Sequence, residues 1–527
     1  MVVAASRTYY TRLPEIPAFI HVEKCWPEVD KLSPCEAACP LHQDVPNYTM
    51  AIAQGDPKKA LAIIRETNPL PSVCGRVCHH PCEIECNRKV VDSPIAIQAL
   101  KRFAADQGQG ELPEPAPRTK AARVAVIGAG PAGLTAGHDL VKMGYGVSIF
   151  EAGQVPGGML ASAVPDFILS PEALAADIAY IKALGVRIHT NVRIGRDISL
   201  DALPRHGFSA VLLAIGAQQS ARLNIPGSDL AGITTALPFL GAAKRRELTS
   251  LKGRVWVIGG GAVAMDCART ALRLGASEVH VACLESRPDM PAFDWEITEA
   301  EREGAQMHPA LAPQEFTTRN GRRVSGISFR RVASTSTDAE GRISWTLVEG
   351  RGSELSVDAD AVIVAIGQMT DTTGFSGGPL NITPRGTVVV NEATGETNVR
   401  GIFAAGDITT GRGTVTEAMA AGRRAARSID QFLSGEPIVA AKDTRGVITI
   451  RPEQVPPYLT RRQQWEVPKL SARQALTTFK EVSLGYVPWQ AIEEARRCLN
   501  CRMCANCIFE RGHLCFDTAD RLLKVGE

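Results

Sequence analysis

Two strand–loop–helix units with glycine-rich loops constrain the fold of this chain more than any other feature. In the first unit, the apolar run 123–127 leads into Gly-Ala-Gly-Pro-Ala-Gly at 128–133, and helical residues follow. The same order recurs from residue 254, where the loop 259–264 reads Gly-Gly-Gly-Ala-Val-Ala. In such units the loop and the N-terminus of the helix bind a pyrophosphate. The repeat therefore predicts an α/β chain with two Rossmann-like dinucleotide-binding domains.

The residues of the first loop have separate predicted tasks. Gly128 allows the tight turn out of the strand, Gly130 lets the backbone approach the pyrophosphate, and Gly133 lets helix and strand pack closely. A second strand, 146–150, ends at Glu151, whose carboxylate is expected to accept hydrogen bonds from ribose hydroxyls. The cofactor-binding residues expected here are completed by Pro131, Ala132, Gly158 and Met159.

The second loop differs from the first in its last residue and in the acid that follows it. Ala264 takes the place of glycine, and the strand 278–283 ends near Glu285. A carboxylate at this point bonds the 2′-hydroxyl of NAD and repels the 2′-phosphate of NADP. Glu285 therefore favours NAD(H), although Arg287 keeps NADP open. The other residues expected to bind this nucleotide are Gly259, Gly261, Ala262 and Val263.

The stretch 397–428 indicates which loop binds which nucleotide. Gly406 and Asp407 follow a short strand, and Thr414 and Val415 precede a helix of small residues. This arrangement resembles the C-terminal flavin motif of flavoproteins with two dinucleotide-binding domains. In that family the Asp meets the ribityl–phosphate region, and the helix N-terminus points at the flavin pyrimidine ring.

Two further strand ends resemble this flavoprotein family. The runs 211–216 and 362–367 match its two ATG-like strand ends with Ile in place of Thr, which adds Gly216 and Gly367 to the expected cofactor-binding residues. The resemblance implies FAD on the first loop and NAD(H) on the second. The FAD domain would then be split around the NAD domain.

Composition and charge exclude several classes of protein. The chain has 527 residues, which is too long for one core, and its net charge is +2, from 58 Lys+Arg against 56 Asp+Glu. Such an even balance of positive and negative charge argues against a nucleic-acid-binding protein. No secretory signal and no run of 18 apolar residues is present. We therefore expect a cytoplasmic protein without membrane insertion.

The 14 cysteines are concentrated near the two ends of the chain, and only Cys267 and Cys283 lie in the middle. In a reducing cytosol, dense cysteines indicate metal or redox sites rather than disulfides. The two in the middle lack paired spacing and are expected to be buried hydrophobes. The remaining twelve are the candidate metal ligands: Cys25, Cys35, Cys39, Cys74, Cys78, Cys82, Cys86, Cys498, Cys501, Cys504, Cys507 and Cys515.

The spacing of these cysteines favours iron–sulfur clusters. Cysteines four residues apart, at 74–86, share one helix face, and the C-terminal group 498–507 repeats the CxxC rhythm of ferredoxins. Structural zinc uses the same thiolates and is the alternative. Because a flavin that receives two electrons needs an exit for single electrons, clusters are the preferred interpretation.

With these motifs the chain resembles the small (beta) subunit of bacterial glutamate synthase and the N-terminal half of dihydropyrimidine dehydrogenase. The resemblance covers roughly residues 33–435. In that family the N-terminal cysteines hold two [4Fe-4S] clusters. The matching motifs are Cys35–Pro40, Asn68–Pro71, Val73–Cys86, the FAD loop, Pro156–Met159 and Gly259–Asp266.

Two departures from the family bear on the ligands. The relatives carry a CxxC just before the position of Cys35, whereas here a similar string ends in Cys498 and Cys501. We hypothesise that the tail folds back, or crosses to a partner chain, to complete a cluster with Cys35 and Cys86. The rival is a self-contained tail cluster.

The second departure is Lys101, at a position where the family has an acid or amide ligand. By resemblance this second cluster would use Cys39, Cys78 and Cys82. Protonated lysine is a poor ligand, so Cys74, Cys25 or Gln98 is expected to substitute.

The expected organisation is a helical [4Fe-4S] domain (1–120), a FAD-binding domain in two parts (121–237 and 391–437), an NAD(H)-binding domain (238–390), and a linker with a C-terminal iron–sulfur segment (438–527). The chain is expected to move electrons between NAD(H), FAD and two or three [4Fe-4S] clusters. No acid–base catalytic residue is expected, because the cofactors carry the chemistry.

Such a chain would exchange electrons with a ferredoxin or a larger catalytic subunit in a hetero-oligomer. Two alternatives remain: an NADPH-dependent glutamate synthase small subunit, and a non-enzymatic scaffold with vestigial nucleotide sites.

Overall fold

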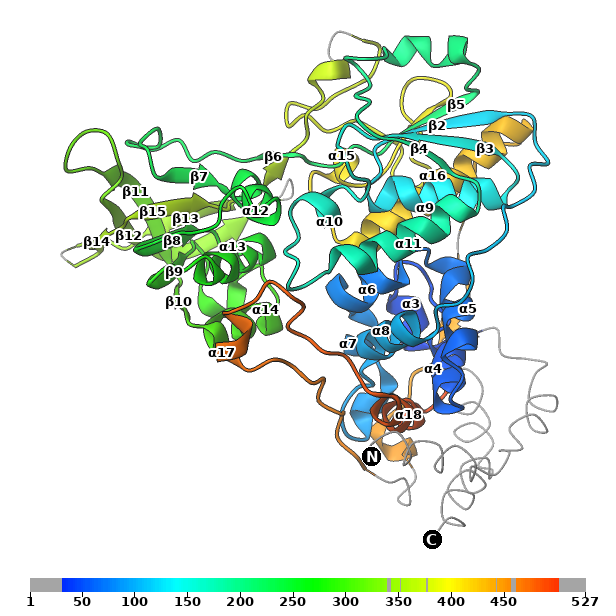
Figure 1. Ribbon diagram of the computed structural model, residues 1–527, viewed down its shortest axis with the longest axis horizontal. Coiled ribbons are helices and arrows are strands. Elements are labelled where there is room, and N and C mark those ends of the chain that lie inside the picture. The colour runs from blue at the N-terminus through cyan, green and yellow to red at the C-terminus, as the bar shows by residue number, and fades with distance from the viewer. Residues whose placement is uncertain are drawn as a thin grey trace.

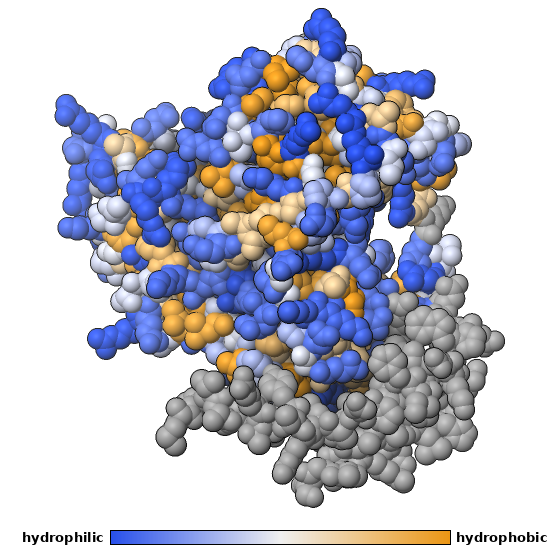
Figure 2. Space-filling view, turned by 45° about the vertical axis from the view of Figure 1, so that its right-hand side comes forward, coloured by the Kyte–Doolittle hydropathy of each residue, from blue (hydrophilic) through white to orange (hydrophobic). Residues whose placement is uncertain are grey.

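The computed structural model describes residues 31–338, 343–350, 352–375, 378–441, 443–455 and 461–501. Figure 1 shows three groups of elements: an upper α/β body, a second α/β body on the left, and a group of short helices below the first. On the face drawn in Figure 2, hydrophilic residues cover most of the surface and hydrophobic residues form small separate groups. No helix in the described ranges is long and apolar enough to cross a membrane.

The upper body is a five-stranded parallel sheet in the order β17-β5-β2-β3-β4. Its central strands are continuous apolar runs because helices cover the sheet. The last strand of this sheet along the chain, β17, pairs with β5, so this domain is split around the second one, as predicted. The strands are β2 (Arg123–Ile127), β3 (Gly146–Phe150), β4 (Arg187–His189), β5 (Ala210–Leu213) and β17 (Ile402–Ala404).

Two helices pack against each other across this domain, α9 (Pro131–Lys142) and α16 (Val415–Ser434). The contact is close because a Cβ on Gly422 of α16 would lie 2.1 Å from the Ala132 carbonyl oxygen. The remaining elements of this body are α10 (Met159–Ser162), α11 (Pro171–Ala183), α15 (Asp407–Thr410), η2 (Leu200–Ala202), η3 (Pro204–His206) and η5 (Thr373–Phe375).

The left-hand body repeats the architecture with the parallel order β10-β9-β8-β15-β7. An antiparallel group, β11 to β14, packs beside it through Phe316, Phe329 and Trp256. The strands are β7 (Ile233–Thr235), β8 (Arg254–Ile258), β9 (Glu278–Ala282), β10 (Ala305–His308), β11 (Leu311–Thr317), β12 (Gly326–Thr337), β13 (Ile343–Leu347), β14 (Glu354–Asp358) and β15 (Ala361–Val364). The helices are α12 (Ala236–Lys244), α13 (Ala262–Arg273), η4 (Arg287–Asp289) and α14 (Asp294–Glu303).

A short antiparallel ribbon, β6 (Gln219–Ser220) with β16 (Gln368–Met369), carries the chain between the two bodies. The strand β7 already belongs to the left-hand sheet, before residue 237. After the ribbon, Phe375, Leu380 and Val388 pack into the core of the upper body. The chain therefore passes from one body to the other before residue 237, and returns before residue 390, the two boundaries that the sequence predicted.

The lower group is built from short helices, and each of the first five has proline in its first turn, where a missing N–H costs nothing. The helices are α3 (Pro34–Ala38), α4 (Val45–Ala53), α5 (Pro57–Thr67), α6 (Pro71–Val77), α7 (Pro81–Ile84), η1 (Asn87–Val90) and α8 (Ile97–Gln107). A two-residue strand, β1 (Lys31–Leu32), is too short to give a sequence signal and forms by pairing with β18 (Gly446–Val447).

The C-terminal part of the chain returns across the molecule. After η6 (Pro452–Gln454), α17 (Ala472–Ala475) contacts α14 of the left-hand body, and α18 (Pro488–Arg496) contacts α4 and α8 of the lower group (Figure 1). Glu481, between these helices, forms ion pairs with Arg76 (2.7 Å) and Arg102 (2.6 Å). The tail is thereby attached to two different domains.

Candidate functional site: a dinucleotide cavity and two thiol sets

A cavity of about 650 Å³ lies at the carboxyl ends of β2, β3 and β5, where ligands bind in open α/β sheets. It is within the usual size range of ligand pockets. Of the residues that the sequence assigned to FAD, only Gly133 is outside its lining. The predicted residues that line it are Gly128, Gly130, Pro131, Ala132, Glu151, Gly158, Met159, Gly216, Gly406, Asp407, Thr414 and Val415.

The glycines of the first loop are required by close approaches of the backbone. Gly128 has a φ of +105°, and a Cβ there would lie 2.4 Å from the Ala214 carbonyl oxygen. A Cβ on Gly133 would lie 2.0 Å from the carbonyl oxygen of Gly128, so Gly133 acts in helix–strand packing rather than at the cavity wall. These contacts give the two glycines the tasks that their spacing suggested.

Acidic residues line this cavity, among them Glu151 and Asp407. The Glu151 carboxylate accepts hydrogen bonds from the backbone N–H groups of Ala129 (2.8 Å) and Gly153 (2.7 Å), which fixes it at the end of β3. Burial, with a smaller contribution from Glu417, raises the pKa of Asp407 to about 6.

The N-terminus of α16 also reaches the cavity. It is closed by a capping box, in which Glu417 accepts from the backbone N–H of Thr414 (2.7 Å) and the Thr414 hydroxyl accepts from the backbone N–H of Glu417 (3.3 Å). Since Thr414 and Val415 line the cavity, the positive end of this 20-residue helix dipole points toward it. The backbone N–H groups of the glycine loop and of this helix N-terminus fit a flavin with its phosphates.

The second loop repeats the geometry of the first. Gly259 has a φ of +138°, and a Cβ there would lie 2.2 Å from the Ala365 carbonyl oxygen. The Glu285 carboxylate lies beside the loop, 3.2 Å from the Cβ position of Gly260. Arg287 points to other partners, pairing with Glu301 (3.3 Å) and Asp294 (3.7 Å). Of these two residues, Glu285 is therefore the one whose charge lies next to this loop.

The structure brings four predicted ligands together around one small cavity, and we call Cys35, Cys86, Cys498 and Cys501 the composite thiol set. Cys35 and Cys86 come from the N-terminal helices, whereas the other two follow α18. Burial raises the pKa of Cys501 to about 11, and the Asn87 side chain, with Nδ2 3.5 Å from its sulfur, opposes that rise.

A second group, the proximal thiol set, contains Cys39, Cys74, Cys78 and Cys82, all buried. Its members surround the buried side chain of Lys101. Burial alone would lower the pKa of Lys101, but the four thiols outweigh burial and raise it. Lys101 is therefore a buried cation beside four cysteine side chains, and one of them is Cys74, which the sequence offered as a substitute ligand. Gln98 is engaged elsewhere, donating to the Cys78 carbonyl oxygen (2.7 Å).

The proximal thiol set touches the helix that lines the dinucleotide cavity. The Thr416 hydroxyl hydrogen-bonds the Cys78 thiol, and Cys74 Sγ lies 3.6 Å from Met419 Sδ. Thr416 directly follows the lining residue Val415. Neither Thr416 nor Met419 carries a sequence signal, because only the packing of α6 against α16 brings them to the thiols.

Four predicted ligands, Cys25, Cys504, Cys507 and Cys515, lie outside the described residues. Cys267 and Cys283 are buried in the left-hand body, at 0% and 3% exposed, as expected of small hydrophobes. Within the described ranges, no three His, Cys, Asp or Glu side chains lie close enough to hold a single metal ion.

Comparison with known proteins agrees with two nucleotide-binding bodies and an N-terminal iron–sulfur domain. Residues 122–422 match the family model "Pyridine nucleotide-disulphide oxidoreductase". The chain belongs to this family. Residues 17–111 match a second model, the 4Fe-4S cluster domain II of dihydropyrimidine dehydrogenase. The chain is therefore an oxidoreductase of the pyridine-nucleotide class with an N-terminal iron–sulfur domain, and the predicted family and fold class are confirmed.

Several of the relatives that this chain resembles are subunits of larger enzymes by name. The chain is 40% identical over 504 residues to the NADP(+)-dependent formate dehydrogenase subunit beta of Moorella thermoacetica, covering 89% of this chain and 70% of that one. It is 36% identical to the NADPH-Fe(3+) oxidoreductase subunit beta of Geobacter sulfurreducens (90% and 76%). It is 33% identical to the glutamate synthase [NADPH] small chain of Azospirillum brasilense (76% and 86%).

Among solved structures, FprA of Mycobacterium tuberculosis in complex with NADPH superposes with a TM-score of 0.51 at 19% identity. The match covers 60% of this chain and 85% of FprA. This likeness supports the two-domain fold of the upper and left-hand bodies.

Proposed function

We propose that this chain transfers electrons between NAD(H), FAD and [4Fe-4S] clusters as one subunit of a larger oxidoreductase. The observation that carries the proposal is the direct contact between the proximal thiol set and α16, the helix whose N-terminus lines the FAD cavity. When bound, FAD would accept one hydride, which carries two electrons, from a nicotinamide and pass the electrons one at a time to iron–sulfur clusters. The protein supplies position and electrostatics.

The residues of the cavity divide this task. The loop from Gly128 and the α9 N-terminus would hold the pyrophosphate, Glu151 the ribose, and Asp407 the ribityl–phosphate region. The α16 N-terminus would stabilise negative charge on the flavin pyrimidine ring. The Lys101 ammonium would offset the negative charge of the proximal thiol set. Two four-cysteine sets among the described residues support at least two clusters.

For the nicotinamide we propose NADH rather than NADPH. Glu285 lies at the second loop, where its carboxylate would accept from a 2′-hydroxyl and repel a 2′-phosphate, while Arg287 is paired with two acids. Several relatives are named for NADP(+) or NADPH, so the preference for NADH that we infer from Glu285 is the point to be tested.

Stopped-flow reduction of the flavin tests both proposals. NADH should bleach the flavin at least tenfold faster than NADPH, and Glu285→Arg should narrow or reverse that ratio. Arg222→Glu, an exposed change outside both nucleotide loops, is the charge-change control. Faster bleaching by NADPH contradicts the NADH assignment and favours the NADPH-dependent glutamate synthase type. No bleaching by either nucleotide contradicts electron transfer and favours a scaffold.

The partner is proposed to be a ferredoxin or a larger catalytic subunit, because the relatives named above are subunits. Co-purification at native expression level followed by mass spectrometry tests this. A stoichiometric partner with its own redox centre supports the assignment, and a chain that isolates alone and reduces no ferredoxin contradicts it.

A further inference from the structure

The C-terminal helix α18 is built into the N-terminal iron–sulfur domain. Tyr486, Ala491 and Ala495 share one buried core with Tyr48 and Ile52 of α4, and that same core contains Cys35, Cys82 and Cys86. Cys498 packs against the edge of this core. The residues that follow the end of α18, including Cys498 and Cys501, lie beside Cys35 and Cys86.

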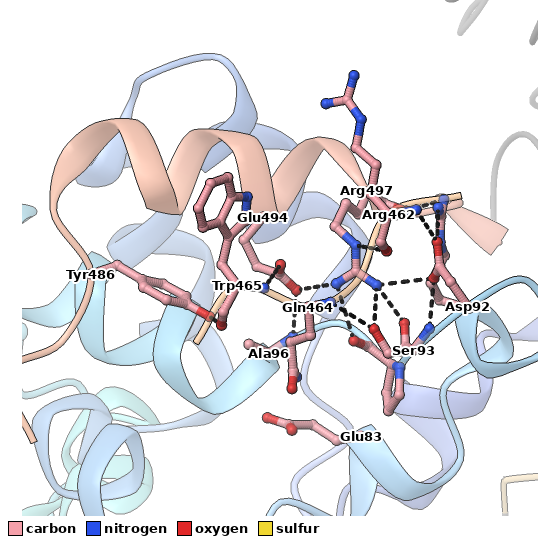
Figure 3. A network of polar contacts seen from close by, with 12 residues as sticks. Glu83, Asp92, Ser93, Ala96, Arg462, Gln464, Trp465, Tyr486, Glu494 and Arg497 are labelled. Atoms are coloured by element: carbon pink, nitrogen blue, oxygen red, sulfur yellow. Dashed lines mark hydrogen bonds and ion pairs between the residues drawn. The ribbon is translucent and has the colours of Figure 1, made fainter. Parts of the chain in front are cut away.

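Arg497 fastens this end of the helix (Figure 3). Its side chain is 2% exposed, and its guanidinium reaches Glu494 Oε1 (2.6 Å) and Asp92 Oδ1 (3.0 Å). It also donates to the carbonyl oxygens of Ser93 (2.6 Å), Pro94 (3.2 Å) and Arg462 (3.0 Å). From the other side, Arg88 donates to the Arg497 carbonyl oxygen (2.9 Å). The peptide directly before Cys498 is thus held by its side chain and by its backbone.

The sulfurs of the composite thiol set receive hydrogen bonds of the kind that stabilise cluster thiolates. The backbone N–H of Asn500 donates to Cys498 Sγ (3.4 Å), and Asn87 Nδ2 donates to Cys501 Sγ (3.5 Å). The Ser33 hydroxyl lies 3.3 Å from Cys35 Sγ. Because Asn87 is the neighbour of Cys86, its bond to Cys501 ties the tail to the N-terminal ligand pair.

We propose that Cys35, Cys86, Cys498 and Cys501 together hold one [4Fe-4S] cluster, so that the two ends of a single chain share it. The matched iron–sulfur domain ends at residue 111 and assigns nothing to the tail. The inference rests on the proposed function only in giving this chain iron–sulfur chemistry. Each thiol would lose its proton to solvent on binding, so ligation and docking of α18 stabilise each other.

Iron counting in paired variants tests the shared site. Cys498→Ser/Cys501→Ser and Cys35→Ser/Cys86→Ser should each lose about four irons and about four sulfides per chain. The fourfold variant should lose no more than either pair, because all four residues serve one cluster. Cys267→Ser/Cys283→Ser, in the left-hand body, is the matched control and should keep its iron. Additive losses of about eight irons would overturn the proposal in favour of a separate tail cluster.

A second measurement uses the unmodified holoprotein and so does not depend on folding of the variants. Alkylation mapped by mass spectrometry should find all four thiols protected before iron chelation and reactive together after it. Labelling of Cys498 and Cys501 while Cys35 and Cys86 stay protected would overturn the proposal. Because neither measurement involves a nucleotide, a failure of NADH to reduce the flavin would refute the proposed function without changing these results.

Discussion

Replacing Arg497 with alanine tests how the tail is held. The guanidinium is the buried cation between Glu494, which is 0% exposed, and Asp92, at 2%. Removing one partner of a buried ion pair costs about 3–5 kcal/mol. Glu494 keeps hydrogen bonds from the backbone N–H groups of Ala96 (2.8 Å) and Trp465 (3.0 Å), so we expect the lower end, about 3 kcal/mol.

The assay is the rate of iron release to a ferrous chelator. If α18 must undock before the composite thiol set releases its iron, a loss of about 3 kcal/mol raises the rate by about 100-fold. Among the described residues, the neighbouring Arg496 pairs only with the partly exposed Glu493 (2.8 Å), and such pairs contribute at most about 1 kcal/mol. Arg496→Ala should therefore change the rate by less than about fivefold. Equal rates for the two variants would refute the reasoning.

Three further predictions concern other parts of the chain. Gly133→Ala places a Cβ 2.0 Å from the Gly128 carbonyl oxygen, so most of the FAD should be lost by flavin absorbance per chain, whereas Gly110→Ala, with open space around it, should keep its flavin. Lys101→Met removes a buried cation, so an EPR titration should find the proximal cluster harder to reduce, with exposed Lys89→Met as the control. Burial, helped by Glu296, raises the pKa of Asp266 to about 8. Since the unfolded carboxyl ionises near its ordinary value, folding retains a proton between about pH 4 and pH 8, and stability should fall by up to about 1.4 kcal/mol per pH unit across that window. Denaturant melts of Asp266→Asn should be flatter with pH, and an unchanged slope would contradict the assignment.

Much of the nucleotide machinery could be predicted because it is local in sequence. The tight turn at Gly128 and the acid at the next strand end lie within one strand–loop–helix unit, and their spacing alone sets their geometry. The sequence places Thr414 and Val415 before a helix of small residues, whereas α16 already includes Val415 and continues to Ser434. The position of this N-terminus bears on function, because Val415 lines the flavin cavity and the next residue, Thr416, lies at the proximal thiol set.

The passages between domains were less predictable. The ribbon of β6 and β16 has two residues in each strand, too few for a periodic signal, so the points of crossing follow only from the tertiary fold. The pairing of β1 with β18 joins residues about 415 apart in the same way. Contacts of this kind depend on which surfaces meet, and no sequence window contains both partners.

The sequence by itself determined that this chain carries two dinucleotide-binding units and twelve cysteines suited to iron–sulfur chemistry, because loop geometry and ligand type are written in short motifs. It left open how the cysteines are grouped, since a thiolate at either end is chemically equivalent. In the tertiary structure, burial of α18 on α4 and the contacts of Arg497 bring Cys498 and Cys501 to Cys35 and Cys86, which is one of the two groupings that the sequence offered. The physical reason is that ligands converge through long-range packing, which is set by the whole fold.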